Sequence, residues 1–115
     1  MDSLTITGTT SIGVSGSTTQ LFYENVTIAG KGYLQVNGDV FMYVDETFDA
    51  SVGVLRFNAN CTIIIKATTI KGPLTIDDSG SMSQATLVIY YDNESDWSID
   101  LISTQLITVV VTKLG

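Results

Sequence analysis

Short stretches that alternate apolar and polar residues recur along this chain. Examples are the sequences LTIT at Leu4–Thr7, LQV at Leu34–Val36 and LRF at Leu55–Phe57. A period of two predicts strands with one face against a core. Turn-forming clusters such as NGD, NAN and KGP separate these stretches. No stretch of twelve residues carries a helical stripe of apolar positions, so the pattern predicts an all-β protein.

Three of these stretches also repeat a common pattern of glycine, any residue, leucine, any residue and a bulky apolar residue. They begin at Gly32, Gly53 and Gly72, which places the starts 21 and 19 residues apart. A near-constant period made of short strands and tight corners predicts a short parallel β-solenoid with about 20 residues per coil. The apolar positions are expected to stack in two interior rows: Leu34, Leu55 and Leu74 in one, and Val36, Phe57 and Ile76 in the other.

An antiparallel β-sandwich or jelly roll is the alternative fold. In that case NGD would be a hairpin turn, and the interval of about 20 residues would span one hairpin. Polar corners that recur in phase with the glycines favour the solenoid. The chain is expected to form a single domain over residues 1–115, with the repeat region at about 13–91. Residues 92–115 lose the pattern and are interpreted as a C-terminal cap or an assembly segment.

Charge narrows the classes of partner. The net charge is −7, and the five basic residues do not cluster, which disfavours binding to nucleic acid. No apolar run approaches the roughly 20 residues of a membrane span, so membrane insertion is not expected. No signal peptide is visible at the N-terminus. The compartment stays unknown, but few charges and many Ser, Thr and β-branched residues are similar to virion surface proteins and favour a virion or cell surface.

The residues that usually carry catalysis are scarce. Histidine is absent from the sequence, which removes Ser-His-Asp and Cys-His sites and imidazole metal ligands. Cys61 is the single cysteine and enters an apolar run, so we interpret it as a buried thiol. We therefore expect no enzymatic activity and no organic cofactor.

One acidic segment has the composition of a weak cation site. Asp92, Glu94 and Asp96 occupy alternate positions in the sequence DNESD. Carboxylates spaced in this way supply the oxygen ligands that Ca²⁺ prefers. The alternative is a solvated acidic loop, because such runs usually lie in water.

The C-terminal segment Leu106–Val111 is apolar on both of its alternating faces. This pattern is typical of a strand covered on both sides. A terminal strand is also free to add to a neighbouring molecule. The first hypothesis is therefore a structural protein that assembles with itself or in a larger particle, for example as a virion decoration, spike or filament subunit. The predicted assembly residues are Leu106, Ile107, Val109, Val110 and Val111.

The second hypothesis is a carbohydrate-binding or other extracellular binding module. Aromatic side chains stack on sugar rings and offer a polar group for orientation. The aromatic residues considered for this role are Tyr23, Tyr33, Tyr43, Tyr90, Tyr91 and Trp97.

Overall fold

The computed structural model describes residues 2–78, 84–95, 98–101 and 106–115, and these residues form strands and connections without a helix. The seven shorter strands of the first two-thirds of the chain are β1 (Leu4–Ile6), β2 (Thr9–Ile12), β3 (Thr18–Tyr23), β4 (Val26–Ile28), β5 (Tyr33–Val36), β7 (Val54–Phe57) and β9 (Leu74–Asp78). The other five are β6 (Asp39–Asp49), β8 (Thr62–Lys71), β10 (Gln84–Ser95), β11 (Ile99–Leu101) and β12 (Leu106–Lys113).

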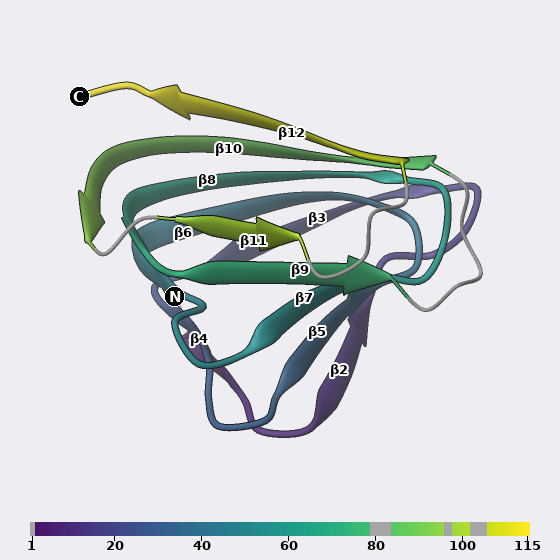
Figure 1. Cartoon of the computed structure of the whole chain (residues 1–115), viewed down its shortest axis with the longest axis horizontal. Helices are drawn as coiled ribbons and strands as arrows, with labels where there is room; N and C mark the ends of the chain where they lie inside the picture. The colour runs from purple at the N-terminus through teal and green to yellow at the C-terminus, as the bar shows by residue number, and fades with distance from the viewer. Residues whose placement is uncertain (1, 79–83, 96–97, 102–105) are drawn as a thin grey trace.

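The strands stack as a parallel β-solenoid of about four turns, with equivalent residues about 22 positions apart (Figure 1). One sheet has the order β1-β4-β6-β8-β10-β12, with β3 beside β6, and the second has the order β11-β9-β7-β5-β2. Every pair of neighbouring strands in the two sheets runs parallel, for example β6 with β8 and β7 with β9. The solenoid prediction is therefore confirmed, and the antiparallel sandwich is not the fold.

Three long strands bend around one corner of the coil. The curves of β6, β8 and β10 lie on top of one another at the left of Figure 1. The pairing register of β6 with β8 shifts between Val44 and Thr47, which marks a bulge at this bend. Because bulges bend strands, the larger sheet covers two sides of the coil while the smaller sheet closes the third.

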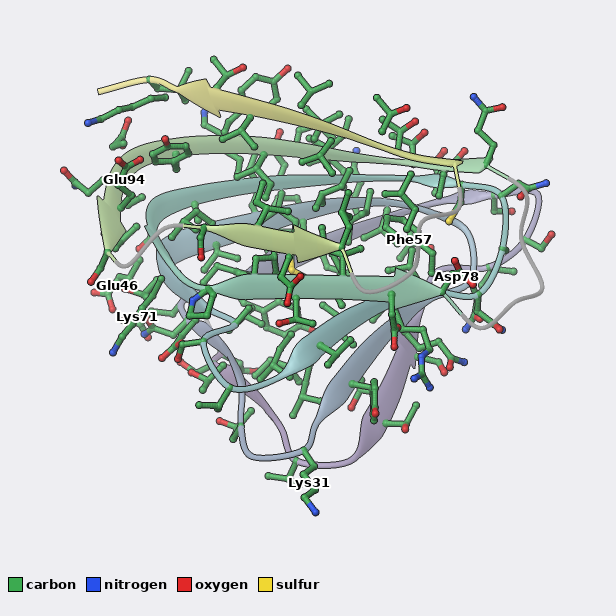
Figure 2. The ribbon with its side chains drawn as sticks, in the orientation of Figure 1. Lys31, Glu46, Phe57, Lys71, Asp78 and Glu94 are labelled. Atoms are coloured by element: carbon green, nitrogen blue, oxygen red, sulfur yellow. The ribbon has the colours of Figure 1, made fainter. Side chains whose placement is uncertain are left out.

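The interior consists of rows of apolar side chains that run from coil to coil. Burial alternates along the strands, so that Val40, Met42 and Val44 of β6 are buried while their neighbours are more exposed. Phe57 of β7 is fully buried and points into this interior (Figure 2). A coil cannot bury its inner face alone, and each inner row exists only because the next coil covers it.

The interior rows differ from the sequence prediction at one strand. Leu34 pairs with Leu55 as expected, but Leu55 then pairs with Ile76 rather than with Leu74. The prediction that Leu74 continues the row was wrong, because it assumed that each glycine begins its coil at the same place. The coils keep a spacing of 21 residues here, whereas the glycines at 53 and 72 are 19 apart. A shift of two residues leaves the inward face unchanged.

The second predicted row changes in the same way. Val36 pairs with Phe57, but Phe57 pairs with Asp78 instead of Ile76. Leu74 pairs with Ile99 on its other side. All six predicted side chains are nevertheless buried, since the shift is an even number of residues.

Polar side chains at the corners bind the next coil. The Asp39 carboxylate accepts a hydrogen bond from the amide of Thr62 (2.8 Å), and the side-chain oxygen of Asn60 accepts one from the amide of Gln84 (3.0 Å). The side-chain nitrogen Nδ2 of Asn58 donates to the side-chain oxygen Oδ1 of Asn37 in the preceding coil (2.8 Å). The polar residues that recur at the corners of the sequence therefore form hydrogen bonds between successive coils.

The stacked region is longer than the predicted repeat region of residues 13–91. Before it, β1 pairs with β4 and β2 pairs with β5. After it, β11 pairs with β9 and β12 pairs with β10. The described residues 92–95, 98–101 and 106–115 therefore add strands to the solenoid, and β12 is the last described strand of its larger sheet.

Candidate functional site

The last strand of the solenoid, β12, pairs on one edge only among the described strands. β12 pairs with β10 over its whole length, from Leu106 beside Gln84 to Lys113 beside Tyr91. The amide of Leu114 donates to the carbonyl of Tyr91 (2.6 Å). Because main-chain groups of a strand alternate in direction, the amides of Ile107, Val109, Val111 and Lys113 point away from β10. No described strand lies on that side of β12.

The inner side chains of the last coil are also incompletely covered. Ile107, Val109 and Val111 continue the interior rows and pack on the core, but they are only half-buried. On β11, Ile99 is half-buried and Leu101 is 42% exposed. We call this surface the open C-terminal end; it consists of Ile99, Leu101, Ile107, Val109 and Val111.

The predicted assembly residues thus lie on two faces of β12. Ile107, Val109 and Val111 belong to the open C-terminal end, whereas Val110 points to the outer face and is 45% exposed. Leu106, described by its backbone only, pairs with Gln84 at the start of the strand. The structure does not include a second molecule, so the assembly role of these residues stays a prediction.

At the opposite end of the solenoid β1, β2 and β3 also pair with one described strand each, and the inward positions include more hydroxyl groups. In the first coil, formed by β1 to β3, Ile6 is 1% and Ile12 is 8% exposed. The other inward side chains of this coil are half-buried, and they include the hydroxyl residues Thr10 and Thr19. No inward side chain of these three strands is exposed.

An acidic corner runs along the solenoid where the long strands bend. The main-chain carbonyl of Asp2 accepts a hydrogen bond from the amide of Glu24, and the carbonyl of Glu24 accepts one from the amide of Glu46 (both 2.8 Å). On β10, Asn93 pairs with Thr69 and Glu94 pairs with Ile70, so Asp92 and Glu94 lie near this bend, and Figure 2 shows Glu46 and Glu94 along this side of the molecule. Thr68 and Thr69 of β8 lie between Glu46 and Asp92 along this corner, so the carboxylates do not form one continuous row.

The residues of the predicted calcium site lie partly at this corner. A hydrogen bond to the Glu94 carboxylate is the main reason that the pKa of Tyr91 is raised, so Glu94 already has a partner. Asp92 lies two residues before Glu94 on β10, and Asp96 lies outside the described residues. Among the residues that the structure describes, no three His, Cys, Asp or Glu side chains gather as a metal site. The Ca²⁺ site stays a prediction.

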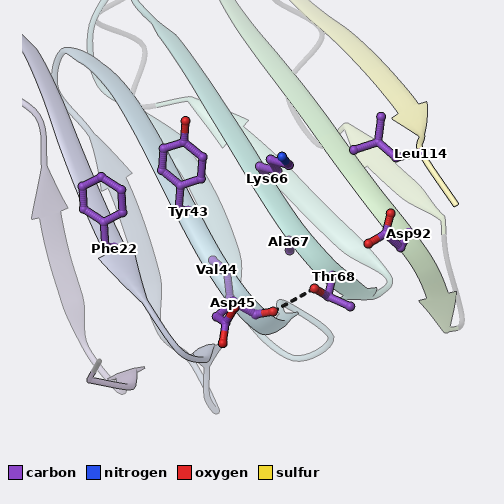
Figure 3. Close-up of a pocket in the computed structure, with 9 residues that line it drawn as sticks. All are labelled: Phe22, Tyr43, Val44, Asp45, Lys66, Ala67, Thr68, Asp92 and Leu114. Carbon is purple, nitrogen blue, oxygen red and sulfur yellow. Dashed lines mark hydrogen bonds between the residues drawn. The ribbon is translucent and has the colours of Figure 1, made fainter.

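A groove of about 410 Å³ crosses the outer face of the larger sheet next to this corner (Figure 3). It begins at Phe22 on β3 and reaches Leu114 beyond β12. The ring of Tyr43 stacks on Phe22, with centroids 5.1 Å apart, and on Phe41 at 4.5 Å. These in-register aromatic side chains form an apolar wall, of which Phe22 is 53% exposed.

Polar groups line the other side of the groove. They are Lys66 and Thr68 of β8, Asp45 of β6 and Asp92 of β10. The Thr68 hydroxyl donates to the carbonyl of Asp45 (2.8 Å), which is the bond drawn in Figure 3. Within the described part of the chain, Lys66 has no ion pair. The groove therefore combines an aromatic wall with one cation and two carboxylates.

The structure separates the other aromatic residues considered for sugar binding. Tyr33 lies on the smaller sheet, where the Arg56 guanidinium is 4.1 Å from its ring centroid. Tyr23 and Tyr91 belong to an inner row, and Tyr90 lies on the outer face between Lys66 and Thr112. Trp97 lies outside the described residues. Of the predicted set, Tyr43 is the one that lines the groove.

The Arg56–Asp77 pair was not predicted from the sequence, whereas the burial of Cys61 was. Arg56 binds Asp77 in the next coil through two hydrogen bonds of 2.9 Å, which raises the pKa of the arginine. This pair follows from the shifted register. Aligning the repeats at Gly53 and Gly72 would have placed Thr75 opposite Arg56, whereas the strands pair Arg56 with Asp77. Cys61 is buried as predicted, and burial with the nearby Asp39 raises the pKa of its thiol to about 11.

Comparison of the chain with protein-family models, with curated proteins and with solved structures finds no match. None of the described residues belongs to a helix long and apolar enough to cross a membrane.

Proposed function

We propose that the protein is a non-enzymatic structural subunit that acts by self-assembly, as in a virion decoration, a spike or a filament. The observation that supports this proposal is the open C-terminal end. There a strand edge with no partner in the described part of the chain occurs together with half-buried aliphatic side chains. Exposed edges are usually protected by charged residues or by a covering segment. Along Ile107–Val111 the edge of β12 carries no charge.

The energetic argument concerns water at this end. The inner side chains of the last coil keep part of their surface in contact with water, and burial contributes roughly 25 cal/mol for each Å² of apolar surface. Main-chain hydrogen bonds to a second strand would add specificity. Association would therefore bury the exposed surface of Ile107, Val109 and Val111.

The test is the mass of the protein in solution. We expect light scattering to give a multiple of 12.3 kDa for the natural chain. Val109→Lys places a charge on the inner face of the edge and should give a folded monomer. Thr108→Lys is the matched control, because Thr108 lies on the outer face of the same strand and is exposed. A natural chain that stays monomeric at high concentration would contradict the proposal.

The groove supports a second candidate function, the binding of a glycan. Its aromatic wall and its charged side chains, such as Lys66 and Asp92, are the two components that sugar-binding surfaces combine. Binding on a glycan array that is lost in Tyr43→Ala, and retained in Tyr33→Ala on the smaller sheet, would favour this candidate. An array without any bound glycan would leave the groove as the outer surface of an aromatic row.

A further inference from the structure

The two ends of the solenoid are stepped. Each coil has three sides: the larger sheet before its bend, the larger sheet after its bend, and the smaller sheet. Before the bend the strands stack in the order β3, β6, β8, β10 and β12, whereas after the bend the order is β1, β4, β6, β8 and β10. The smaller sheet has the order β2, β5, β7, β9 and β11. Each side is therefore equally deep, but the three sides do not begin and end at the same level.

The steps at the two ends are complementary. β3 and β4 both pair with β6 and lie at one level, while β1 and β2 lie one strand further out. At the other end β12 lies one strand beyond β10 and β11, on the side where the first end is short (Figure 1). A second copy stacked on this end would place its β3 against β12. Its β1 and β2 would at the same time reach β10 after the bend and β11, so every side of the coil would be continued.

The same steps oppose a joint between two identical ends. At the C-terminal end one side of three stands a strand higher than the others. When two such ends face each other, at least one side stays apart by an additional strand spacing of about 4.8 Å, whichever sides are opposed. Two first coils meet with the same difficulty, because there two sides of three stand higher. The joint between unlike ends is the one that closes all three sides.

The inward side chains at the two ends also fit each other. Continuing the rows of the larger sheet places Val109 beside Thr19 and Val111 beside Leu21 of the second copy. All four of these side chains are half-buried in the single chain. The joint therefore covers apolar surface on both copies, and such surface contributes roughly 25 cal/mol for each Å² that is buried.

The charged residues at the joint do not repel each other in this register. Lys113 would lie beside Tyr23 of the second copy, and Glu94 would lie beside its Leu4. Asp100 on the smaller sheet would lie beside a threonine, at position 9. Like charges directly opposite on neighbouring strands are destabilising, and this register places none of these three beside a charged residue.

We propose that copies of the chain stack head to tail, with β12, β10 and β11 of one copy against β3, β1 and β2 of the next. This inference rests on the proposed self-assembly and specifies its partner surface and its geometry. The two surfaces differ, so the contact is heterologous and every oligomer keeps one free end of each kind. The product is a continuous solenoid that grows as a filament. Since each side has five strands, a strand spacing of about 4.8 Å gives an axial repeat of about 24 Å for each copy.

Cysteine cross-linking tests this geometry. Val110 and Gln20 are both exposed on the outer face and belong to one row, so Val110 of one copy would lie beside Gln20 of the next. A strand spacing of about 4.8 Å is within the Cα separation of a disulfide bond. Val110→Cys and Gln20→Cys are prepared as single variants and as a double variant, and are oxidised with copper phenanthroline. Unchanged melting temperatures under reducing conditions show that the variants fold.

An equimolar mixture of the two single variants should give a covalent dimer on a non-reducing gel, and the double variant should give a ladder of covalent oligomers. Each single variant alone should stay uncross-linked, because equal positions in successive copies lie about 24 Å apart. The natural chain is one control, because its Cys61 is buried. The second control is a mixture of Val110→Cys with Thr68→Cys, since Thr68 is exposed on β8 away from both ends. Both controls should stay uncross-linked.

Three results would count against these proposals. A covalent dimer of Val110→Cys alone would mean that two C-terminal ends meet, and one of Gln20→Cys alone would mean that two first coils meet; either result overturns the head-to-tail joint. An oligomer by light scattering that gives no cross-link in the mixture also overturns it, because another surface then mediates assembly. A natural chain that is monomeric by light scattering would instead reject the proposed function itself.

Discussion

The first and last coils of this solenoid are made of equivalent strands, yet they end the molecule in different ways. In the first coil Ile6 and Ile12 are buried, whereas Leu4, Leu21 and Tyr23 are half-buried. In the last coil Val109 and Leu101 occupy comparable inward positions but retain contact with water. A repeat protein needs ends that differ from its middle, and here both terminal coils keep half-buried inward side chains, while only the first also contains fully covered ones such as Ile6. The comparison teaches that an inward apolar pattern does not by itself guarantee burial.

The largest expected loss of stability is at Leu55, which belongs to a coil with neighbours on both sides. Leu55 is fully buried between Leu34 and Ile76. Leu55→Ala should lower the free energy of unfolding by about 2–5 kcal/mol, as truncation of buried leucines does. Urea denaturation measures this change. Val54→Ala, on the outer face of the same strand, should cost less than about 1 kcal/mol; equal losses for the two variants would mean that the alternation of faces is wrong.

The second prediction compares the two ends directly. Ile6→Ala in the first coil should cost about 2–4 kcal/mol, because Ile6 is buried. Ile107→Ala in the last coil should cost about 1 kcal/mol or less, since its side chain already contacts water. Both free energies of unfolding are measured in the Val109→Lys background, so that association does not contribute. Similar losses at the two ends would break the comparison.

The third prediction tests how closely the coils approach each other. A Cβ atom at Gly53 would lie 2.0 Å from Cγ2 of Ile28, whereas one at Gly8 would have no atom within 4 Å. Gly53→Ala should therefore destabilise the fold by about 1–3 kcal/mol through overpacking. Gly8→Ala should stay within about 0.5 kcal/mol of the natural chain. Thermal unfolding of the two variants decides, and a neutral Gly53→Ala would mean that the interior of the middle coils is loosely packed.

The smallest effect concerns the corner beside the last coil. The pKa of Tyr91 is raised chiefly by its hydrogen bond to Glu94, so Glu94→Gln should lower this pKa toward the ordinary value for tyrosine. Because the folded pKa is the higher one, the stabilisation by this bond is present below the unfolded pKa near 10 and is lost as pH rises through the folded value. Ultraviolet titration of the tyrosines measures the shift. An unchanged titration in Glu94→Gln would show that another group holds the Tyr91 hydroxyl.

Much of the architecture was predictable from the sequence. Alternation at Leu34–Val36 and Leu55–Phe57 gave the strands, and the spacing of Gly32 and Gly53 gave a coil of about the right length. The polar corners were also predictable as positions, since Asn37 and Asn58 recur 21 residues apart. These features are local or strictly periodic, so they leave a direct trace in the order of residues.

The candidate sites were less predictable. The C-terminal strand was singled out for its two apolar faces, but no pattern indicated that Val109 would stay partly exposed while Val110 faces outward. The groove brings together Phe22, Lys66 and Asp92 from three different coils. Residues so far apart in sequence become neighbours only through the stacking, and no short motif connects them.

By itself the sequence determined the inward face of each strand, the approximate length of the coil and the absence of histidine chemistry. The tertiary structure decided the register, which moved Ile76 into the row of Leu55 and brought Asp77 to Arg56. A shift of two residues preserves the inward pattern, so the pattern cannot distinguish one register from the other. The burial of Ile6 in the first coil and the partial exposure of Val109 in the last arise in the same way, because burial of an inward side chain depends on the coil stacked against it.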